Sequence, residues 1–397
     1  MILAIPTETR AGERRVAVVP EIAKRLVDQG WDVVVQAGAG SEATFSDQAY
    51  ADAGARIAAD AKAVVDGANV IVKVNAPTQE EATSYPDGVL VMSFLQATQS
   101  VEALKVLAAK GATAVSFDLL PRISRAQSMD ALSSQATVSG YRSGLAAAEH
   151  LAKFFPMFMT AAGTVPPAKV LVMGVGVAGL QAIATARRLG ANVRAYDVRS
   201  AAKEEAESLG ASFVDLGVKA EGEGGYAREL TPDEVAAQQA ALTAEVAGSD
   251  VVITTAAVPG RKAPTLVTAA MVDQMGPGSV IIDMAADGGG NCELTVAGET
   301  VIHGNTAVVG LANPPSGMPT HASFLYSRNV INLLDLFSDE GALNPDWADE
   351  IVLGTTVLKD GKVTNQMAAE ALGLEYEPIT PPAPEPDEAP AEEAKEG

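Results

Sequence analysis

The glycine-rich turn at residues 174–179 (GVGVAG) carries the clearest chemical signal in the chain. It follows an apolar run, Val170–Met173, and precedes an apolar stretch with helical periodicity. Gly174 permits a tight turn, Gly176 lets backbone N–H groups approach a pyrophosphate, and Gly179 allows the helix to pack closely on the strand. The segment therefore predicts a dinucleotide-binding unit.

A carboxylate stands where such a unit would contact the adenine ribose. Asp197 lies 18 residues after Gly179, at the end of the next predicted strand, Asn192–Asp197. A carboxylate at this place accepts from both ribose hydroxyls. Beside a 2′-phosphate it would cost roughly 4 kcal/mol for each pair of unit charges about 4 Å apart at an effective dielectric of about 20. Arg199 offsets part of this repulsion, and the sequence predicts a preference for NAD over NADP.

A second polar segment, residues 122–130, lies where two α/β units join. It contains Arg122, Gln127 and Asp130 and has neither helical nor strand periodicity, so we expect residues 118–130 to form a loop. Clefts between domains commonly bind ligands. Ordinary surface loops carry the same residue types, so the residues alone leave both interpretations open.

The elements around these segments predict two parallel-sheet units. Short apolar runs alternate with helical patterns over residues 1–120, and a second alternating series begins at Lys169. A helix is expected from Ser133 to Phe155, and another, from His321 to Phe337, is expected to pack on the first unit. The fold class is therefore α/β, with two doubly wound parallel-sheet domains, the second a Rossmann domain. The expected divisions are a discontinuous domain of residues 1–130 plus 315–374, a domain of residues 131–314, and a disordered acidic, Pro-rich tail of residues 375–397.

Composition excludes several classes of function. The 397 residues include 28 Lys+Arg and 50 Asp+Glu, and a net charge of -22 argues against a nucleic-acid partner. The single cysteine, Cys292, excludes an internal disulfide. No secretory leader is apparent, and the uncharged run at residues 170–186 is too short and too glycine-rich for a membrane span, so we expect none. The three histidines, His150, His303 and His321, lack metal-ligand spacing, so no metal site is expected.

Two further glycine-containing segments have competing interpretations. Residues 38–43 (GAGSEA) also match G-x-G-x-x-G after a strand, but Ser46 has the character of the N-cap of the following helix. We therefore interpret this segment as a structural turn. Residues 221–226 (EGEGGY) fit either a lid that closes on a cofactor or a plain surface loop.

Several segments resemble the alanine dehydrogenase and transhydrogenase superfamily. They are residues 5–17 (IPTETRAGERRVA), residues 159–186 and residues 278–294. Residues 121–130 (PRISRAQSMD), followed by SSQ and GYR, resemble the NAD(H)-binding domain I of proton-translocating NAD(P) transhydrogenases. The resemblance covers roughly residues 1–370 and implies a separately encoded NAD(H)-binding subunit of a three-chain enzyme.

The resemblance implies that the chain binds NADH and passes hydride directly to NADP+ held by a partner subunit. A membrane subunit would couple this Si-specific/Re-specific transfer to proton translocation. Direct transfer needs two nicotinamides held close together rather than a protein acid or base. The family further implies a homodimer that is cytoplasmic and is held at the inner face of the cell membrane by its partner subunits.

The resemblance also implies roles for individual residues. Gln127 would reach toward the partner's nicotinamide ribose, while Arg122 and Asp130 would fix the near nicotinamide. Tyr226 matches the tyrosine of the family's mobile loop. The other implied NAD(H) contacts are Ile123, Ser124, Ser128, Met129, Gly174, Gly176, Val177, Gly179, Asp197, Val198, Arg199, Gly225, Gln238 and Ala257.

Two alternatives remain open. Alanine dehydrogenase needs a general acid/base; Arg15 and Lys73 match its substrate residues and Asp287 matches an acid of its amino-acid site. The position of its catalytic histidine, however, reads Gln96, which cannot take a proton at neutral pH. The other alternative is a non-catalytic NAD(H)-sensing module.

Overall fold

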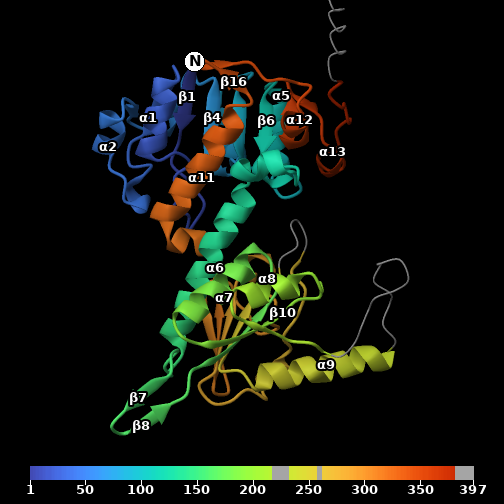
Figure 1. Ribbon diagram of the computed structural model, residues 1–397. Helices are drawn as coiled ribbons and strands as arrows, with labels where there is room; N and C mark the ends of the chain where they lie inside the picture. The colour runs from blue at the N-terminus through green and yellow to red at the C-terminus, as the bar shows by residue number, and fades with distance from the viewer. Residues whose placement is uncertain (217–231, 257–261, 381–397) are drawn as a thin grey trace, which may run out of the picture.

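The computed structural model describes residues 1–216, 232–256 and 262–380, which form two lobes, one above the other (Figure 1). Each lobe is built on a mainly parallel β-sheet. This arrangement confirms the predicted fold class of two doubly wound units.

The first lobe, at the top of Figure 1, contains an eight-stranded sheet among the described residues. Its strands are β1 (Ile2–Ile5), β2 (Asp32–Gln36), β3 (Arg56–Ala58), β4 (Val70–Asn75), β5 (Leu90–Phe94), β6 (Thr113–Ser116), β18 (Thr356–Lys359) and β19 (Lys362–Val363). Their order is β19-β18-β6-β5-β4-β1-β2-β3, and β1 to β6 run parallel. The last two strands, far away in sequence, add antiparallel to β6.

Helices cover both faces of this sheet. They are α1 (Pro20–Asp28), α2 (Asp47–Asp52), α3 (Ala61–Val65), α4 (Gln79–Ser84), α5 (Val101–Ala109), α11 (Pro319–Leu334), α12 (Glu350–Thr355) and α13 (Gln366–Leu372), with short 3₁₀ helices η1 (Ser41–Ala43), η2 (Phe117–Leu119), η3 (Ser124–Met129) and η5 (Pro314–Gly317). Because both faces are covered, β4 is apolar and buried on each side, with Val72 in one core and Ile71 in the other.

The second lobe has the strand order of a dinucleotide-binding Rossmann sheet. Its strands are β9 (Lys169–Met173), β10 (Asn192–Tyr196), β11 (Ser212–Phe213), β12 (Val251–Thr254), β13 (Val280–Asp283), β14 (Thr300–His303) and β15 (Thr306–Gly310). They are ordered β11-β10-β9-β12-β13-β15-β14, with only β14 antiparallel. Chain order reverses between β9 and β12, and the carboxyl ends of strands at such a point are where open α/β sheets bind ligands.

Helices and two small hairpins complete the structure. The helices of the second lobe are α6 (Ala131–His150), α7 (Val177–Arg188), α8 (Ala202–Ser208), α9 (Pro232–Ala247) and α10 (Ala269–Val272), with the 3₁₀ helix η4 (Ala286–Gly288). The hairpins are β7 (Phe158–Thr160) with β8 (Gly163–Val165), which projects from the bottom of Figure 1, and β16 (Ser338–Asp339) with β17 (Ala342–Leu343).

The chain crosses between the lobes twice. Helix α6 makes the first crossing, and residues 311–318, between β15 and α11, make the second (Figure 1). In the second lobe α6 packs tightly on α7, because a Cβ at Gly140 would lie 2.1 Å from the Ala178 carbonyl oxygen and one at Gly144 would lie 2.7 Å from Thr185 Cγ2. After the second crossing α11 returns to the core of the first lobe, as expected.

Several predicted elements differ from those observed. Residues 118–130 are not an irregular loop: they contain η3, because Ala126 and Met129 turn into the first core. Helix α6 ends at His150 rather than Phe155, since buried Phe155 instead accepts at its carbonyl from Ala168 N, leading into the β7–β8 hairpin. That hairpin and strands β14 to β19 were not predicted.

Some sequence expectations are not tested by these elements. The proposed boundaries at residues 130 and 315 stay predictions, and most of the predicted tail, from residue 381 onward, lies outside the described residues. Within the described ranges, no helix combines the length and apolar character that crossing a membrane requires.

Candidate functional site

The glycine-rich turn lies between β9 and α7 and has the steric requirements that its sequence predicts. Gly174 has φ +98°, and a Cβ there would lie 2.5 Å from Thr255 Oγ1. A Cβ at Gly179 would lie 1.9 Å from the Gly174 carbonyl oxygen. A Cβ at Gly176, by contrast, would meet nothing within 4 Å. The turn is thus closed where the strand and helix must touch and open where a phosphate would approach.

Helix α7 begins directly after this opening. Gly176 is its N-cap and has no side chain to occupy the first N–H groups, while its carbonyl accepts from Leu180 N at 2.8 Å. Val177, the first helical residue, is half-exposed. A helix of twelve residues that starts with unoccupied N–H groups suits a pyrophosphate, so these residues fit a dinucleotide.

Asp197 follows β10, and its carboxylate faces the same turn. Its Oδ2 accepts from Val175 N at 2.7 Å, and its Oδ1 accepts from Arg199 N at 2.8 Å. Arg199 Nε and Nη2 donate to the two oxygens, each at 3.0 Å. Burial raises the pKa of Asp197, but these hydrogen bonds and the Arg199 charge outweigh burial and lower that pKa below its ordinary value. The ionised carboxylate can accept hydrogen bonds from ribose hydroxyls.

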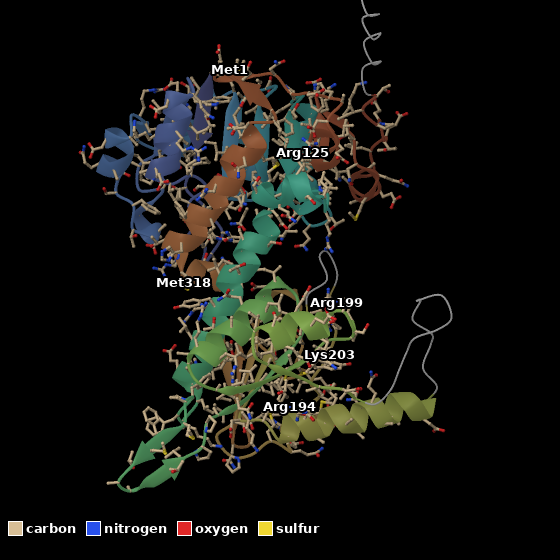
Figure 2. All side chains as sticks on the ribbon, viewed as in Figure 1. Met1, Arg125, Arg194, Arg199, Lys203 and Met318 are labelled. Atoms are coloured by element: carbon tan, nitrogen blue, oxygen red, sulfur yellow. The ribbon has the colours of Figure 1, made fainter. Side chains whose placement is uncertain are left out.

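Arg199 lies across the outer side of the turn. Its Nη2 also donates to the Val175 carbonyl oxygen at 3.2 Å, yet its side chain is 60% exposed. Figure 2 shows Arg199 on the part of the second lobe that is nearer the first lobe. Its neighbour Val198 is more exposed still, at 84%. Both side chains are therefore accessible to a ligand at the carboxyl end of the sheet.

The segment at residues 122–130 is fixed to the first lobe on one side. Ala126 and Met129 pack into its core, and Asn329 Nδ2 and Asn332 Nδ2 both donate to the Ser128 carbonyl oxygen at 2.9 Å. Arg125, labelled in Figure 2, forms a bidentate pair with Asp349. The segment is a held platform rather than a free loop.

The outer side of this platform carries Arg122 and Gln127. Both residues are exposed, and neither side chain makes a hydrogen bond or ion pair with any described residue. Asp130 differs, because its carboxylate caps α6: Oδ1 accepts from Ser133 N at 2.8 Å and Oδ2 from Ser133 Oγ at 2.5 Å. Among the predicted contacts here, Ser124 and Ser128 are exposed, whereas the side chains of Ile123 and Met129 pack on the core.

The remaining predicted contacts are divided by position. Gln238 lies on α9, with Nε2 3.5 Å from Tyr196 Oη, which places it near the end of β10. Gly225, Tyr226 and Ala257, and with them the predicted lid at residues 221–226, lie outside the described residues. Between the described segments 122–130 and 174–199, no hydrogen bond or ion pair is formed, so the two groups of site residues belong to opposite lobes.

Two residues that the sequence analysis missed support the glycine-rich turn. Thr255 Oγ1 donates to the Gly174 carbonyl oxygen at 3.0 Å. Fully buried Asn291 accepts from Ala256 N at 3.0 Å and donates to the Ala256 and Pro264 carbonyl oxygens, both at 2.8 Å. Together they fix the end of β12 beside the turn. The signal in the sequence was the run GGGN at residues 288–291.

The other glycine-rich segment is closed. A Cβ at Gly40 would lie 2.8 Å from the Tyr50 ring and 2.9 Å from Phe45, and η1 rather than an α-helix follows. Ser46 Oγ accepts from Ala49 N and caps α2, which confirms the predicted N-cap. With its backbone covered by side chains, this segment has the structure of a turn that supports the core.

The residues that alanine dehydrogenase would use for its substrate are already partnered. Lys73 is 1% exposed and its Nζ lies 2.6 Å from Glu81. Arg15 is 6% exposed and is bonded to Glu13. Gln96 is exposed and carries no titratable group, and Asp287 Oδ2 accepts from Asn313 N at 2.7 Å. Across the segments of the chain that the structure describes, no cluster of potential metal ligands occurs.

Known proteins give the same division into two regions. The family model described as "Alanine dehydrogenase/PNT, N-terminal domain" matches residues 4–139, and the "C-terminal domain" model matches residues 143–366. In Rhodospirillum rubrum, the first of the separate chains named as NAD(P) transhydrogenase subunit alpha is 46% identical over 376 residues, covering 92% of this chain and 98% of that one. The solved structure of transhydrogenase from Sinorhizobium meliloti matches with a TM-score of 0.81 at 42% identity, covering 92% and 100% of the two chains. The alanine dehydrogenase of Halomonas elongata is 32% identical over 386 residues, covering 95% and 98%.

Proposed function

Because the chain belongs to the alanine dehydrogenase/PNT family, we propose that it is the NAD(H)-binding subunit of a proton-translocating NAD(P) transhydrogenase. In this role it transfers hydride directly from NADH to NADP+ bound by a partner subunit. The observation that carries the proposal is the platform at residues 122–130, which is held to the first lobe yet presents Arg122 and Gln127 without protein partners among the described residues.

The second lobe holds NADH in this proposal. The turn at Gly174–Gly179 and the start of α7 receive the pyrophosphate, and Asp197 receives the adenine ribose. Val198, Arg199 and Gln238 lie around the same strand end and line the adenosine side. Predicted contacts Gly225, Tyr226 and Ala257 complete the site as proposals only.

The chemistry requires positioning and no protein acid or base. NADH supplies the hydride: a C–H bond of its ring breaks with its electron pair, and the pair forms a C–H bond on the NADP+ ring, while no proton is exchanged. Arg122 and Asp130 fix the near ring and Gln127 extends toward the partner's cofactor. Such orientation contributes to rate because misplacement by about 1 Å can cost on the order of 100-fold.

Other subunits complete the enzyme in this proposal. One holds NADP(H), and a membrane subunit couples the Si-specific/Re-specific transfer to proton translocation. The name of the R. rubrum relative describes only a first portion of subunit alpha, which supports a separately encoded component. The chain would then act on the cytoplasmic side, held at the inner face of the membrane through these partners.

A homodimer formed through the β7–β8 hairpin belongs to the same proposal. Large apolar side chains on and before the hairpin are exposed: Phe154, Met157, Phe158, Met159 and Val165. A cavity of about 770 Å³ lies beside them, lined by residues 151–154, residues 165–169 and Asp250. A two-fold arrangement covers both hairpins with the same surface of a second copy. Sedimentation of the isolated chain should give twice its mass of 40.7 kDa; a monomer would refute the interface.

A substitution of Gln127 tests the hydride-transfer role. Gln127→Asn shortens an exposed side chain, so we expect hydride transfer with partner subunits to fall by on the order of 100-fold while the dissociation constant of NADH changes little. Gln48→Asn, the same change on exposed α2, is the matched control and should leave both quantities unchanged. Equal losses of NADH affinity and rate would contradict a positioning role.

A second assay separates the alternatives. Wild-type chain with pyruvate, ammonia and NADH should form no alanine, because Gln96 is not a base and Arg15 and Lys73 are bonded to carboxylates. Alanine formation that depends on this chain would favour alanine dehydrogenase. NADH binding with neither activity, even with partner subunits present, would favour a sensing module.

A further inference from the structure

The buried pair of Glu13 and Arg15 touches both crossings between the lobes. Glu13 Oε2 accepts from Asn313 Nδ2 at 3.0 Å and Glu13 Oε1 accepts from Ser316 Oγ at 2.5 Å. Both donors lie on the second crossing. Arg15 Nη1 donates to Gln135 Oε1 at 2.9 Å, and Gln135 lies in the second turn of α6, the first crossing. One ion pair therefore holds both connections.

The network extends from these contacts into the neighbouring helix. Gln135 Nε2 donates to the Ala322 carbonyl oxygen at 3.0 Å, which ties α6 to the start of α11. Met318, just before α11, lies at the junction of the lobes in Figure 2. Adjacent on α6, Ser134 Oγ donates to Asn329 Oδ1 at 2.7 Å, and Asn329 in turn holds the Ser128 carbonyl oxygen of the platform. The pair is thus connected to the platform that carries Gln127.

Asn313 joins the network to the second lobe. Its backbone N–H donates to Asp287 Oδ2, in η4 after β13, at 2.7 Å. Its side chain donates to Glu13 in the first lobe, so one residue contacts both lobes. Its backbone is left-handed, with φ +41°, a conformation that asparagine and glycine tolerate better than other residues. The second crossing turns at this residue.

We propose that Glu13, Arg15 and Asn313 form a brace that fixes the angle between the two lobes, and that they are positioning residues for hydride transfer. In this account Arg15 does not bind a substrate, although its position matches a substrate residue of alanine dehydrogenase. Its guanidinium is occupied by Glu13, Gln135 and, at 3.4 Å, Asn313. The brace sets how the platform at residues 122–130 faces the glycine-rich turn, which lies in the other lobe.

Arginine substitutions here risk unfolding the first lobe, so the test uses Asn313→Gly. Glycine keeps the left-handed backbone and the N–H bond to Asp287, and removes the side-chain bonds to Glu13 and Ser316. The matched control is Asp360→Gly, which changes a left-handed residue (φ +50°) in the β18–β19 turn, away from both crossings. Ser316→Ala, which removes the hydroxyl that bridges Glu13 and Arg14 N, is the second variant.

The main measurement is the distance between the lobes in the isolated chain. Spin labels at Gln48→Cys on α2 and Lys203→Cys on α8, in a Cys292→Ser background, report this distance by double electron–electron resonance. Labelled chain is diluted with unlabelled chain so that only distances within one copy are seen. We expect Asn313→Gly and Ser316→Ala to broaden or shift the distribution and Asp360→Gly to leave it unchanged. A wild-type distribution in both brace variants would overturn the proposal.

The kinetic consequence rests on the proposed transhydrogenase function and is measured separately. With partner subunits, Asn313→Gly should lower kcat at least about tenfold, while the KM for NADH stays within about threefold, because the glycine-rich turn is untouched. The control Asp360→Gly should match wild type in both constants. If wild type itself transfers no hydride, the proposed function fails while the distance measurement still decides the brace. A changed distance distribution with unchanged kcat would overturn the positioning role.

Discussion

Two arginine–carboxylate pairs with the same spacing occupy the two lobes in opposite surroundings. Glu13 and Arg15 are two residues apart in the first lobe, with both side-chain bonds at 2.7 Å. Asp197 and Arg199 are two residues apart in the second lobe, with both bonds at 3.0 Å. The side chains of the first pair are 0% and 6% exposed, and those of the second are 8% and 60% exposed.

The difference lies in the other partners of each pair. Glu13 and Arg15 use their remaining atoms on both crossings between the lobes, so the pair is enclosed. Asp197 uses its remaining capacity on Val175 N in the glycine-rich turn, and most of Arg199 faces solvent. Residue type and spacing alone therefore do not distinguish a structural pair from a ligand-binding pair; burial and third partners do.

Removing each arginine should give the largest contrast between the pairs. Arg15→Gln leaves the Glu13 carboxylate buried without its charge partner, and we expect a loss of about 3–5 kcal/mol in the free energy of unfolding. Arg199→Gln leaves Asp197 close to solvent, so the loss should be below about 1 kcal/mol. Urea unfolding of both variants measures the two values. Equal losses would mean that burial does not separate the pairs.

Removing each carboxylate charge should affect cofactor binding in only one lobe. Asp197→Asn replaces a charge-assisted hydrogen bond with a neutral one, so NADH should bind more weakly by roughly 1–2 kcal/mol, on the order of tenfold. NADPH should bind better, because the repulsion of its phosphate is removed and Arg199 becomes available. Dissociation constants for both cofactors at one salt concentration give the ratio.

Glu13→Gln is the matched control for this ratio, since it removes the corresponding charge in the other lobe. It should leave the preference for NADH over NADPH as in wild type. An unchanged ratio in Asp197→Asn would mean that Asp197 does not face the ribose, and a changed ratio in Glu13→Gln would mean that the first pair also contacts the cofactor.

Acid should produce the smallest contrast, with the same sign in both lobes. Burial raises the pKa of Glu13, but the hydrogen bonds and charge of Arg15 outweigh burial and lower it, as happens at Asp197. The unfolded carboxyls take up protons first, near about pH 4. Stability from each pair is therefore complete above that pH and is lost as the pH falls toward the lower folded pKa.

Unfolding from about pH 6 to about pH 3.5 tests this sign. The stability advantage of wild type over Glu13→Gln should shrink as the pH falls, and that over Asp197→Asn should shrink less, because Arg199 is largely exposed. An advantage that grows in acid for either carboxylate would contradict a lowered pKa.

The sequence predicted the Rossmann unit because its signals are local. The glycines of residues 174–179, the flanking apolar strand and Asp197 at the next strand end are close in the chain, and each depends on near neighbours. The structural interpretation of residues 38–43 rested on Ser46 as an N-cap, which is also a local signal. Periodicity likewise located most of the strands and the returning helix α11.

Long-range contacts could not be predicted in the same way. Residues 118–130 lack periodicity because η3 is held by Asn329 and Asn332, about 200 residues later, rather than by its own pattern. Asn313 has no marker in the sequence, since its role arises from contacts with Glu13 and Asp287 in different lobes. The strands β18 and β19 join a sheet whose other strands end more than 200 residues earlier, so no local pattern predicts their pairing.

Isotope transfer tests the central claim most directly. The chain is combined with its membrane and NADP(H)-binding partner subunits, NADP+, and NADH deuterated at the transferable position, and the NADPH product is examined by mass spectrometry. Direct transfer between nicotinamides predicts NADPH that carries the deuterium, with none incorporated from deuterated water when unlabelled NADH is used. NADPH without the label, or no NADPH from a complete complex that binds both cofactors, would contradict the assignment of this chain as the hydride-donating subunit.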